Sequence, residues 1–292
     1  MQRLPIIGQF SGPSFVEAVQ QAAFAAAGVE IEIDRWDRKP HQLADAITAL
    51  KAGDYIGALI AAPHKERASA LVGTLSDDAK QSGAVSVVVR DGQRLRGYNA
   101  DVDGVRAGLV SILPKVQGKW PRQAVVLGAG GGARAVVSVL IGSGFQRIAV
   151  FNRHLHRAEA LVSHFARSAR HMDLRAMPWH ETIIAAELSK AGLLVNTTAI
   201  GIAADENPIE ADALPSDLHV LDLVLDHAVT PLMRQAKERG GTVSNGQLSF
   251  LRASAETFRL LTGQEAPESV MRETLAAELG MPSEGVAVVV GD

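Results

Sequence analysis

The stretch QAVVLGAGGGARAVVSVLIGSG, residues 123–144, decides the fold class of this chain. It predicts a short apolar strand, a glycine-rich turn and an Ala/Val-rich helix, and that context is what the pattern G-x-G-x-x-A requires. The glycines allow a tight turn and a close approach of the backbone to a pyrophosphate, which the helix N-terminus attracts. We therefore predict a dinucleotide site, and the residues expected to form it are Gly128, Ala129, Gly130, Gly131, Gly132 and Ala133.

The next expected strand, residues 147–153, indicates which dinucleotide is bound. NAD sites usually carry Asp or Glu about 20 residues after the turn, where the carboxylate bonds to the ribose 2′-hydroxyl. This strand ends instead in Asn152-Arg153-His154 and is followed by Arg157. Guanidinium groups bond a 2′-phosphate in a fork, whereas a carboxylate would repel it. NADP is therefore the predicted cofactor, held by these four residues; the alternative is that the arginines only form a solvated helix start.

A metal site is not predicted. His154 and His156 form an H-x-H pair, but no third histidine or cysteine stands at ligand spacing.

Strand and helix patterns alternate on both sides of the glycine turn. In the N-terminal part, the order β-α-β-α-β predicts a largely parallel sheet; the segments are 4–8, 15–28, 30–36, 41–53 and 56–63. Later strands are expected at 193–198 and 219–225, and helices at 155–169 and 230–240. Residues 246–279 are expected to form one or two helices that return to the first domain. The valine-rich tail 285–292 predicts a frayed end or an added edge strand, with a partner-binding strand as the alternative.

Composition excludes several classes of function. The 292 residues predict about two domains, and the net charge of −3 gives no basic field for nucleic acid or anionic membranes. No cysteine is present, which excludes disulfides and thiolate chemistry. The first ten residues have too short an apolar run for a signal peptide, and no apolar stretch reaches about 18 residues. We expect a cytoplasmic protein with neither a nucleic-acid nor a membrane partner.

Several segments together resemble the shikimate dehydrogenases, over nearly all of residues 4–263. Each segment alone is common, but their combination and order are specific. They are GQFSGPS (8–14), APHK (62–65), GYNADVDG (97–104), GAGGGARA (128–135), FNRHLHRA (151–158), VNTTAIG (195–201) and DLVLDHAVTPL (222–232).

The resemblance implies an α/β protein of two domains, an N-terminal substrate domain and a Rossmann-like NADP-binding domain, with chemistry in the cleft between them. Members of this family interconvert 3-dehydroshikimate and shikimate with NADPH, a step of aromatic amino acid biosynthesis, and some accept quinate or NAD. The implied boundaries are 1–105 for the substrate domain, 106–244 for the dinucleotide-binding domain, 245–280 for returning helices and 281–292 for a tail.

The resemblance also assigns roles to residues outside the glycine turn. Lys65 matches the catalytic lysine and Asp101 the catalytic aspartate, which would orient the lysine and the substrate hydroxyl. Without the family match, Lys65 would more simply be a surface lysine and Asp101 a helix cap. The remaining matches are Ser14 and Asn99 for the substrate, and Thr197 and Thr198 for the cofactor. Ser86 is also expected to contact the substrate, although it stands where the family has asparagine.

The chain departs from the family pattern at several positions that normally hydrogen-bond the substrate. The substituted positions are Val16, Leu59, Ile60, Ala61, Ser86, Ala100, Leu225 and Ala253, and His154 stands where the family usually has threonine. Each lost hydrogen bond removes about 0.5–1.5 kcal/mol, or about 1.5–3 when the partner is charged. Three readings stay open: a shikimate dehydrogenase, a dehydrogenase of quinate or another cyclic hydroxy acid, and a non-catalytic NADP sensor. Lys65 and Asp101 disfavour the sensor, and a monomer or homodimer is expected.

Overall fold

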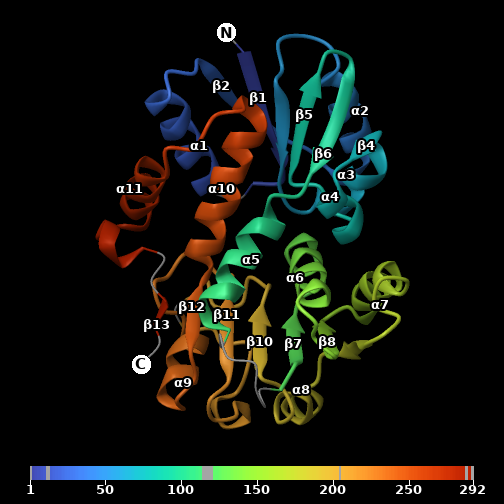
Figure 1. Ribbon diagram of the computed structural model, residues 1–292, viewed down its shortest axis with the longest axis vertical. Helices are drawn as coiled ribbons and strands as arrows, with labels where there is room; N and C mark the ends of the chain where they lie inside the picture. The colour runs from blue at the N-terminus through green and yellow to red at the C-terminus, as the bar shows by residue number, and fades with distance from the viewer. Residues whose placement is uncertain (1, 11–13, 114–120, 204, 287–288, 291–292) are drawn as a thin grey trace. The chain divides into compact units, whose positions relative to one another are not determined.

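The computed structural model describes residues 2–10, 14–113, 121–203, 205–286 and 289–290 (Figure 1). The chain divides into two compact units: Met1–Asp103 with Leu251–Val286, and Gly104–Phe250 with Ala287–Asp292. We call them the first and the second unit. Within the described residues, the helices are all too short or too polar to cross a membrane.

The first unit contains a mixed six-stranded sheet in the order β2-β1-β3-β5-β6-β4. Its strands are β1 (Gln2–Gly8), β2 (Ile31–Asp37), β3 (Gly57–Ile60), β4 (Thr74–Leu75), β5 (Val87–Asp91) and β6 (Arg94–Tyr98). The predicted parallel pairing is confirmed for β1 with β2 and with β3. The sheet is less parallel than predicted, because β5 and β6 form an antiparallel hairpin and β5 pairs antiparallel with β3.

Helices cover the first unit's sheet with apolar side chains. The short helices α2 (Leu43–Ala49), α3 (Lys65–Leu71) and α4 (Asp77–Ser82) contribute to one buried cluster with the strands. Helix α1 (Phe15–Ala26) contacts α11 (Glu268–Leu279) and α10 (Gly246–Thr262). The rings of Phe24 and Phe258 lie 5.4 Å apart, so the C-terminal helices pack on the N-terminal part of the chain.

The second unit contains a seven-stranded sheet in the order β13-β12-β11-β10-β7-β8-β9. Its strands are β7 (Gln123–Leu127), β8 (Arg147–Asn152), β9 (Asp173–Pro178), β10 (Leu193–Asn196), β11 (His219–Asp222), β12 (Val243–Asn245) and β13 (Val289–Val290). The first six are parallel, and β13 from the valine-rich tail pairs antiparallel with β12 at the edge. The other tail residues 287, 288, 291 and 292 lie outside the described residues.

The chain leaves β7 toward β8 and returns on its other side at β10. This reversal is the topological switch point at which open α/β sheets bind ligands, beyond the carboxyl ends of the strands. The helices of this unit are α5 (Asp101–Ile112, shared with the first unit), α6 (Gly131–Gly142), α7 (Leu155–Phe165), α8 (Glu181–Leu188) and α9 (Pro231–Glu238). Side chains of α8 and α9 form one buried cluster with alternate residues of the strands.

Candidate functional site

A lysine–aspartate pair lies at the start of two helices of the chain. Lys65 is the first residue of α3 and Asp101 the first residue of α5. The Lys65 Nζ donates a hydrogen bond to Asp101 Oδ2 at 2.6 Å, and the two side chains are 24% and 22% exposed. The pair is therefore formed in the protein itself, and part of each charged group remains accessible to a ligand.

Three polar contacts fix the backbone that carries Asp101. Ser86 Oγ accepts from the Ala100 N–H at 2.8 Å, and Asn99 Oδ1 accepts from the Asp101 N–H at 3.2 Å. The Asn99 amide donates in turn to Ser82 Oγ at 2.8 Å. Ser86 and Asn99 are both buried, and these contacts are with the protein, so their role in binding substrate stays a prediction.

Two further residues organise the first unit near its predicted site. His64, which precedes Lys65, is fully buried and its Nε2 lies 2.7 Å from the Arg38 carbonyl oxygen, a contact that the sequence reasoning missed. Ser14 caps α1, because its Oγ accepts from the Glu17 N–H at 3.4 Å. Residues 11–13 of the GQFSGPS segment (8–14) lie outside the described residues.

The glycine turn connects β7 to α6 as predicted. Gly128 has a φ of +103°, and a Cβ built on it would stand 2.3 Å from Thr197 Oγ1. Gly130 caps α6, and the nearest atom to a Cβ built there is a guanidinium nitrogen of Arg157 at 4.0 Å. Ala133 is fully buried in the helix. The turn thus leaves space beside Gly130, next to a cation, at a helix N-terminus that favours anions.

The segment predicted to select NADP follows β8. Arg153, His154, His156 and Arg157 are exposed, and the Asn152 amide donates to the His154 carbonyl at 2.9 Å. The rings of His154 and His156 lie 5.9 Å apart. No group of three or more potential metal ligands occurs among the residues that the structure describes.

The threonines after β10 hydrogen-bond to the end of β7 and to Asn196, which in turn contacts a buried carboxylate. Thr197 Oγ1 donates to the Leu127 carbonyl at 2.6 Å, and Thr198 Oγ1 donates to Asn196 Oδ1 at 2.7 Å. The Asn196 amide donates to Asp222 Oδ1 at 2.9 Å. Since Asn196 and Asp222 end β10 and β11, this network holds the carboxyl ends of two central strands in place.

Asp222 is a buried acid that sequence reasoning did not single out. It is fully buried, and burial raises its pKa to about 6, although hydrogen bonds from Thr230 Oγ1, the Val224 N–H and the Asn196 amide oppose the rise. Its place just after an apolar run, at the start of the DLVLDHAVTPL segment, is typical of a strand end but does not predict its burial.

Replacing Asp222 with Asn is expected to remove part of the pH dependence of stability. The pKa of about 6 in the folded state exceeds the ordinary value of 3.8, so the folded state keeps the proton up to a higher pH than the unfolded state does. The acid therefore stabilises the fold below about pH 4, and this contribution, about 3 kcal/mol, is lost as pH rises to about 6. In urea unfolding experiments between pH 4 and pH 7, the free energy of unfolding of the variant should rise relative to that of the wild type by about that amount. Exposed Asp226→Asn is the control, and parallel curves for D222N and wild type would contradict the assignment.

Two family models match parts of the chain, one around Lys65 and the other around the glycine turn. The shikimate dehydrogenase substrate binding domain matches residues 6–88, and shikimate / quinate 5-dehydrogenase matches residues 113–205. A curated relative, the shikimate dehydrogenase (NADP(+)) of Symbiobacterium thermophilum, is 37% identical over 96% of this chain and 95% of its own length.

Solved structures of the same kind have the same fold. The shikimate 5-dehydrogenase of Thermus thermophilus, in complex with NADP(H) and shikimate, is 29% identical with a TM-score of 0.77, covering 95% of this chain and 99% of that one. The quinate dehydrogenase of Corynebacterium glutamicum, in complex with NAD, is 28% identical with a TM-score of 0.82, covering 94% and 99%. With its two-unit α/β fold, its glycine turn and its Lys65–Asp101 pair, the chain belongs to the shikimate dehydrogenase family.

Proposed function

We propose that this protein is an NADP-dependent oxidoreductase that interconverts 3-dehydroshikimate and shikimate. The observation that carries the proposal is the 2.6 Å Lys65–Asp101 pair, because a lysine and a carboxylate held together and partly accessible suit proton transfer to a reacting oxygen. The relatives named shikimate dehydrogenase (NADP(+)) support the same activity. In this proposal the first unit binds the hydroxy acid and the second unit binds the cofactor.

The proposed chemistry needs one proton for each hydride. The glycine turn, Arg153 and Arg157 would hold NADPH, which would be the source of the hydride for the carbonyl carbon of 3-dehydroshikimate. As the carbonyl π-bond breaks, the oxygen takes the proton of the Lys65 ammonium and becomes the hydroxyl of shikimate. In the reverse direction the neutral amine of Lys65 removes that proton. Asp101 holds Lys65 in place and accepts a hydrogen bond from it.

The second unit offers the groups that NADP requires. The space beside Gly130 suits a pyrophosphate, since among the described residues beyond its chain neighbours the nearest atom to a Cβ built there is the Arg157 guanidinium nitrogen, at 4.0 Å. Arg153 and Arg157 are exposed at the start of α7, where guanidinium groups would bond the 2′-phosphate.

Replacing Arg157 with Ala is expected to raise the KM for NADP⁺ much more than that for NAD⁺, which shares the pyrophosphate near this guanidinium but has no 2′-phosphate. A hydrogen bond to a charged group contributes about 1.5–3 kcal/mol, so the rise should be about tenfold to a hundredfold. Arg167→Ala, which removes an exposed arginine further along the chain, is the control and should change neither value. A rise of equal size for both cofactors would mean that Arg157 supports the turn and does not read the 2′-phosphate.

A second candidate function is the oxidation of a different cyclic hydroxy acid, such as quinate. The observation that favours it is the apolar character of four partly exposed positions where the family's polar pattern is lost, namely Val16, Ala61, Leu225 and Ala253. The likeness to a quinate dehydrogenase is consistent with this candidate.

One assay separates these candidates. NADP⁺ and NAD⁺ reduction is followed at the nicotinamide absorbance with shikimate, quinate and related cyclic hydroxy acids. Efficient turnover of shikimate with NADP⁺ supports the main proposal, and turnover of another acid instead supports the second. Tight NADP⁺ binding without turnover of any acid contradicts both and favours the sensor reading. We also propose that the protein is cytoplasmic and that it is a monomer or a homodimer. Sedimentation of the purified protein tests the oligomeric state.

A further inference from the structure

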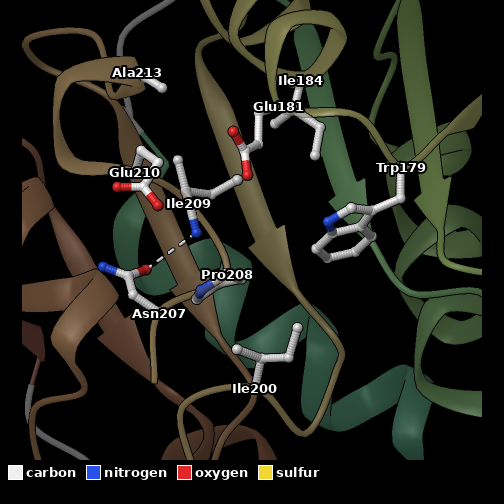
Figure 2. Close-up of a pocket in the computed structure, with 9 residues that line it drawn as sticks. All are labelled: Trp179, Glu181, Ile184, Ile200, Asn207, Pro208, Ile209, Glu210 and Ala213. Atoms are coloured by element: carbon white, nitrogen blue, oxygen red, sulfur yellow. Dashed lines mark hydrogen bonds between the residues drawn. The ribbon is translucent and has the colours of Figure 1, made fainter. Parts of the chain in front are cut away.

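A cavity of about 170 Å³ opens in the second unit, and none of the residues that line it is among those assigned to cofactor or substrate above (Figure 2). It is lined by Trp179, which follows β9, by the first turns of α8 and by the loop after β10. The volume far exceeds what one water molecule needs and suits a small organic molecule. We call it the Trp179 cavity.

The apolar floor of the Trp179 cavity is preformed. Ile184 and Ile209 are 2% and 5% exposed, and they belong to the buried cluster that α8 and α9 form with the strands of the second unit's sheet. Asn207 Oδ1 accepts from the Ile209 N–H at 3.2 Å, which holds the loop in its conformation (Figure 2). Trp179 packs against the same cluster and remains partly exposed, so its ring forms a wall that a ligand can contact.

The charged groups of the Trp179 cavity are all negative among its described lining residues. Glu181 and Glu210 are both exposed carboxylates, and neither lysine nor arginine lines the space. Figure 2 shows the Trp179 ring and the Glu181 side chain extending toward the loop that carries Pro208 and Ile209. Carboxylates repel an anion and attract a cation, and the face of an indole ring attracts cations more strongly than any other side-chain ring.

Only one of the two carboxylates, that of Glu181, also has a structural role in a helix. Glu181 begins α8, where a carboxylate also complements the helix dipole, so its presence has a structural reason. Glu210 lies outside the α-helices, just before the short 3₁₀ turn Ala211–Ala213. Glu210 is therefore the cleaner position at which to test a ligand's charge.

We propose that the Trp179 cavity binds a small organic cation of the alkylammonium class, with its alkyl groups against Trp179 and Ile209 and its charge beside Glu181 and Glu210. The proposal is independent of the reaction proposed above, because none of these residues takes part in it.

The test compares three probes of one shape, tert-butylammonium, tert-butanol and pivalate, by saturation-transfer NMR titration of the full-length protein at low ionic strength. The cation should bind most tightly and the anion least. Glu210→Gln should weaken cation binding about two- to fivefold, and Trp179→Leu about three- to thirtyfold. Glu206→Gln, an exposed glutamate of the same loop that does not line the cavity, should bind the cation as the wild type does.

Equal binding of all three probes, or cation binding that survives both Glu210→Gln and the Glu181→Gln/Glu210→Gln double variant, would overturn the proposal. Circular dichroism establishes whether Trp179→Leu folds. If it does not, the two glutamine variants still decide, because they leave the apolar floor intact.

Discussion

Replacing Lys65 with Met is expected to lower kcat about a hundred- to ten-thousandfold, the range that a positioned acid–base group contributes. Methionine keeps an unbranched apolar stem but has no proton to give to the reacting oxygen. The hydride step would then have to draw its proton from water. Since the cofactor groups lie in the other unit, NADP⁺ binding should stay close to that of the wild type.

Lys80→Met is the matched control for this variant. Lys80 is also paired with an aspartate, with 3.5 Å between its Nζ and Asp77 Oδ1, but on the exposed face of helix α4. Its loss should leave kcat unchanged. Partly exposed ion pairs contribute about 0–1 kcal/mol, so neither variant should melt far below the wild type. Full turnover by Lys65→Met, with its fold and its cofactor binding intact, would remove the lysine from the mechanism.

The cofactor half of the protein could be predicted in detail because its signals are local. The glycine turn, the strand before it and the helix after it are adjacent in sequence, and the structure places Gly128 and Gly130 as the pattern requires. The hairpin of β5 and β6 was missed although Asp91-Gly92 stands at its turn, a dipeptide that favours such hairpins. Because this hairpin was not predicted, the mixed character of the first unit's sheet was not predicted either.

The groups that support the site could not be read from sequence, because their partners are distant along the chain. Asn99 meets Ser82 and Asn196 meets Asp222 only after the strands have paired. A lone polar residue beside an apolar run predicts neither its partner nor its burial. The family resemblance could therefore place Lys65 and Asp101, but the contacts that hold Asp101 come from the structure alone.

Gly128→Ala and Gly130→Ala are expected to fail in different ways, and that difference tests the cofactor site. At Gly128 the φ of +103° and the 2.3 Å approach to Thr197 Oγ1 leave no room for a Cβ. Strain and overpacking together should cost about 2–5 kcal/mol of stability. At Gly130 the backbone is extended, with a φ of −96°, and a Cβ built there would stand 4.0 Å from a guanidinium nitrogen of Arg157. Alanine there should change stability by less than about 1 kcal/mol.

The Gly130→Ala variant is informative because it should fold and yet bind cofactor poorly. Its methyl group would occupy the space that a pyrophosphate needs beside the N-terminus of α6, so the Kd for NADP⁺ should rise about tenfold or more. Gly142→Ala is the control, since it adds the same methyl group at the end of α6 with nothing within 4 Å. Calorimetric titration with NADP⁺ and thermal unfolding separate the two effects. Unchanged affinity in a stable Gly130→Ala protein would mean that the glycines serve only the turn, and the dinucleotide site would have to lie elsewhere.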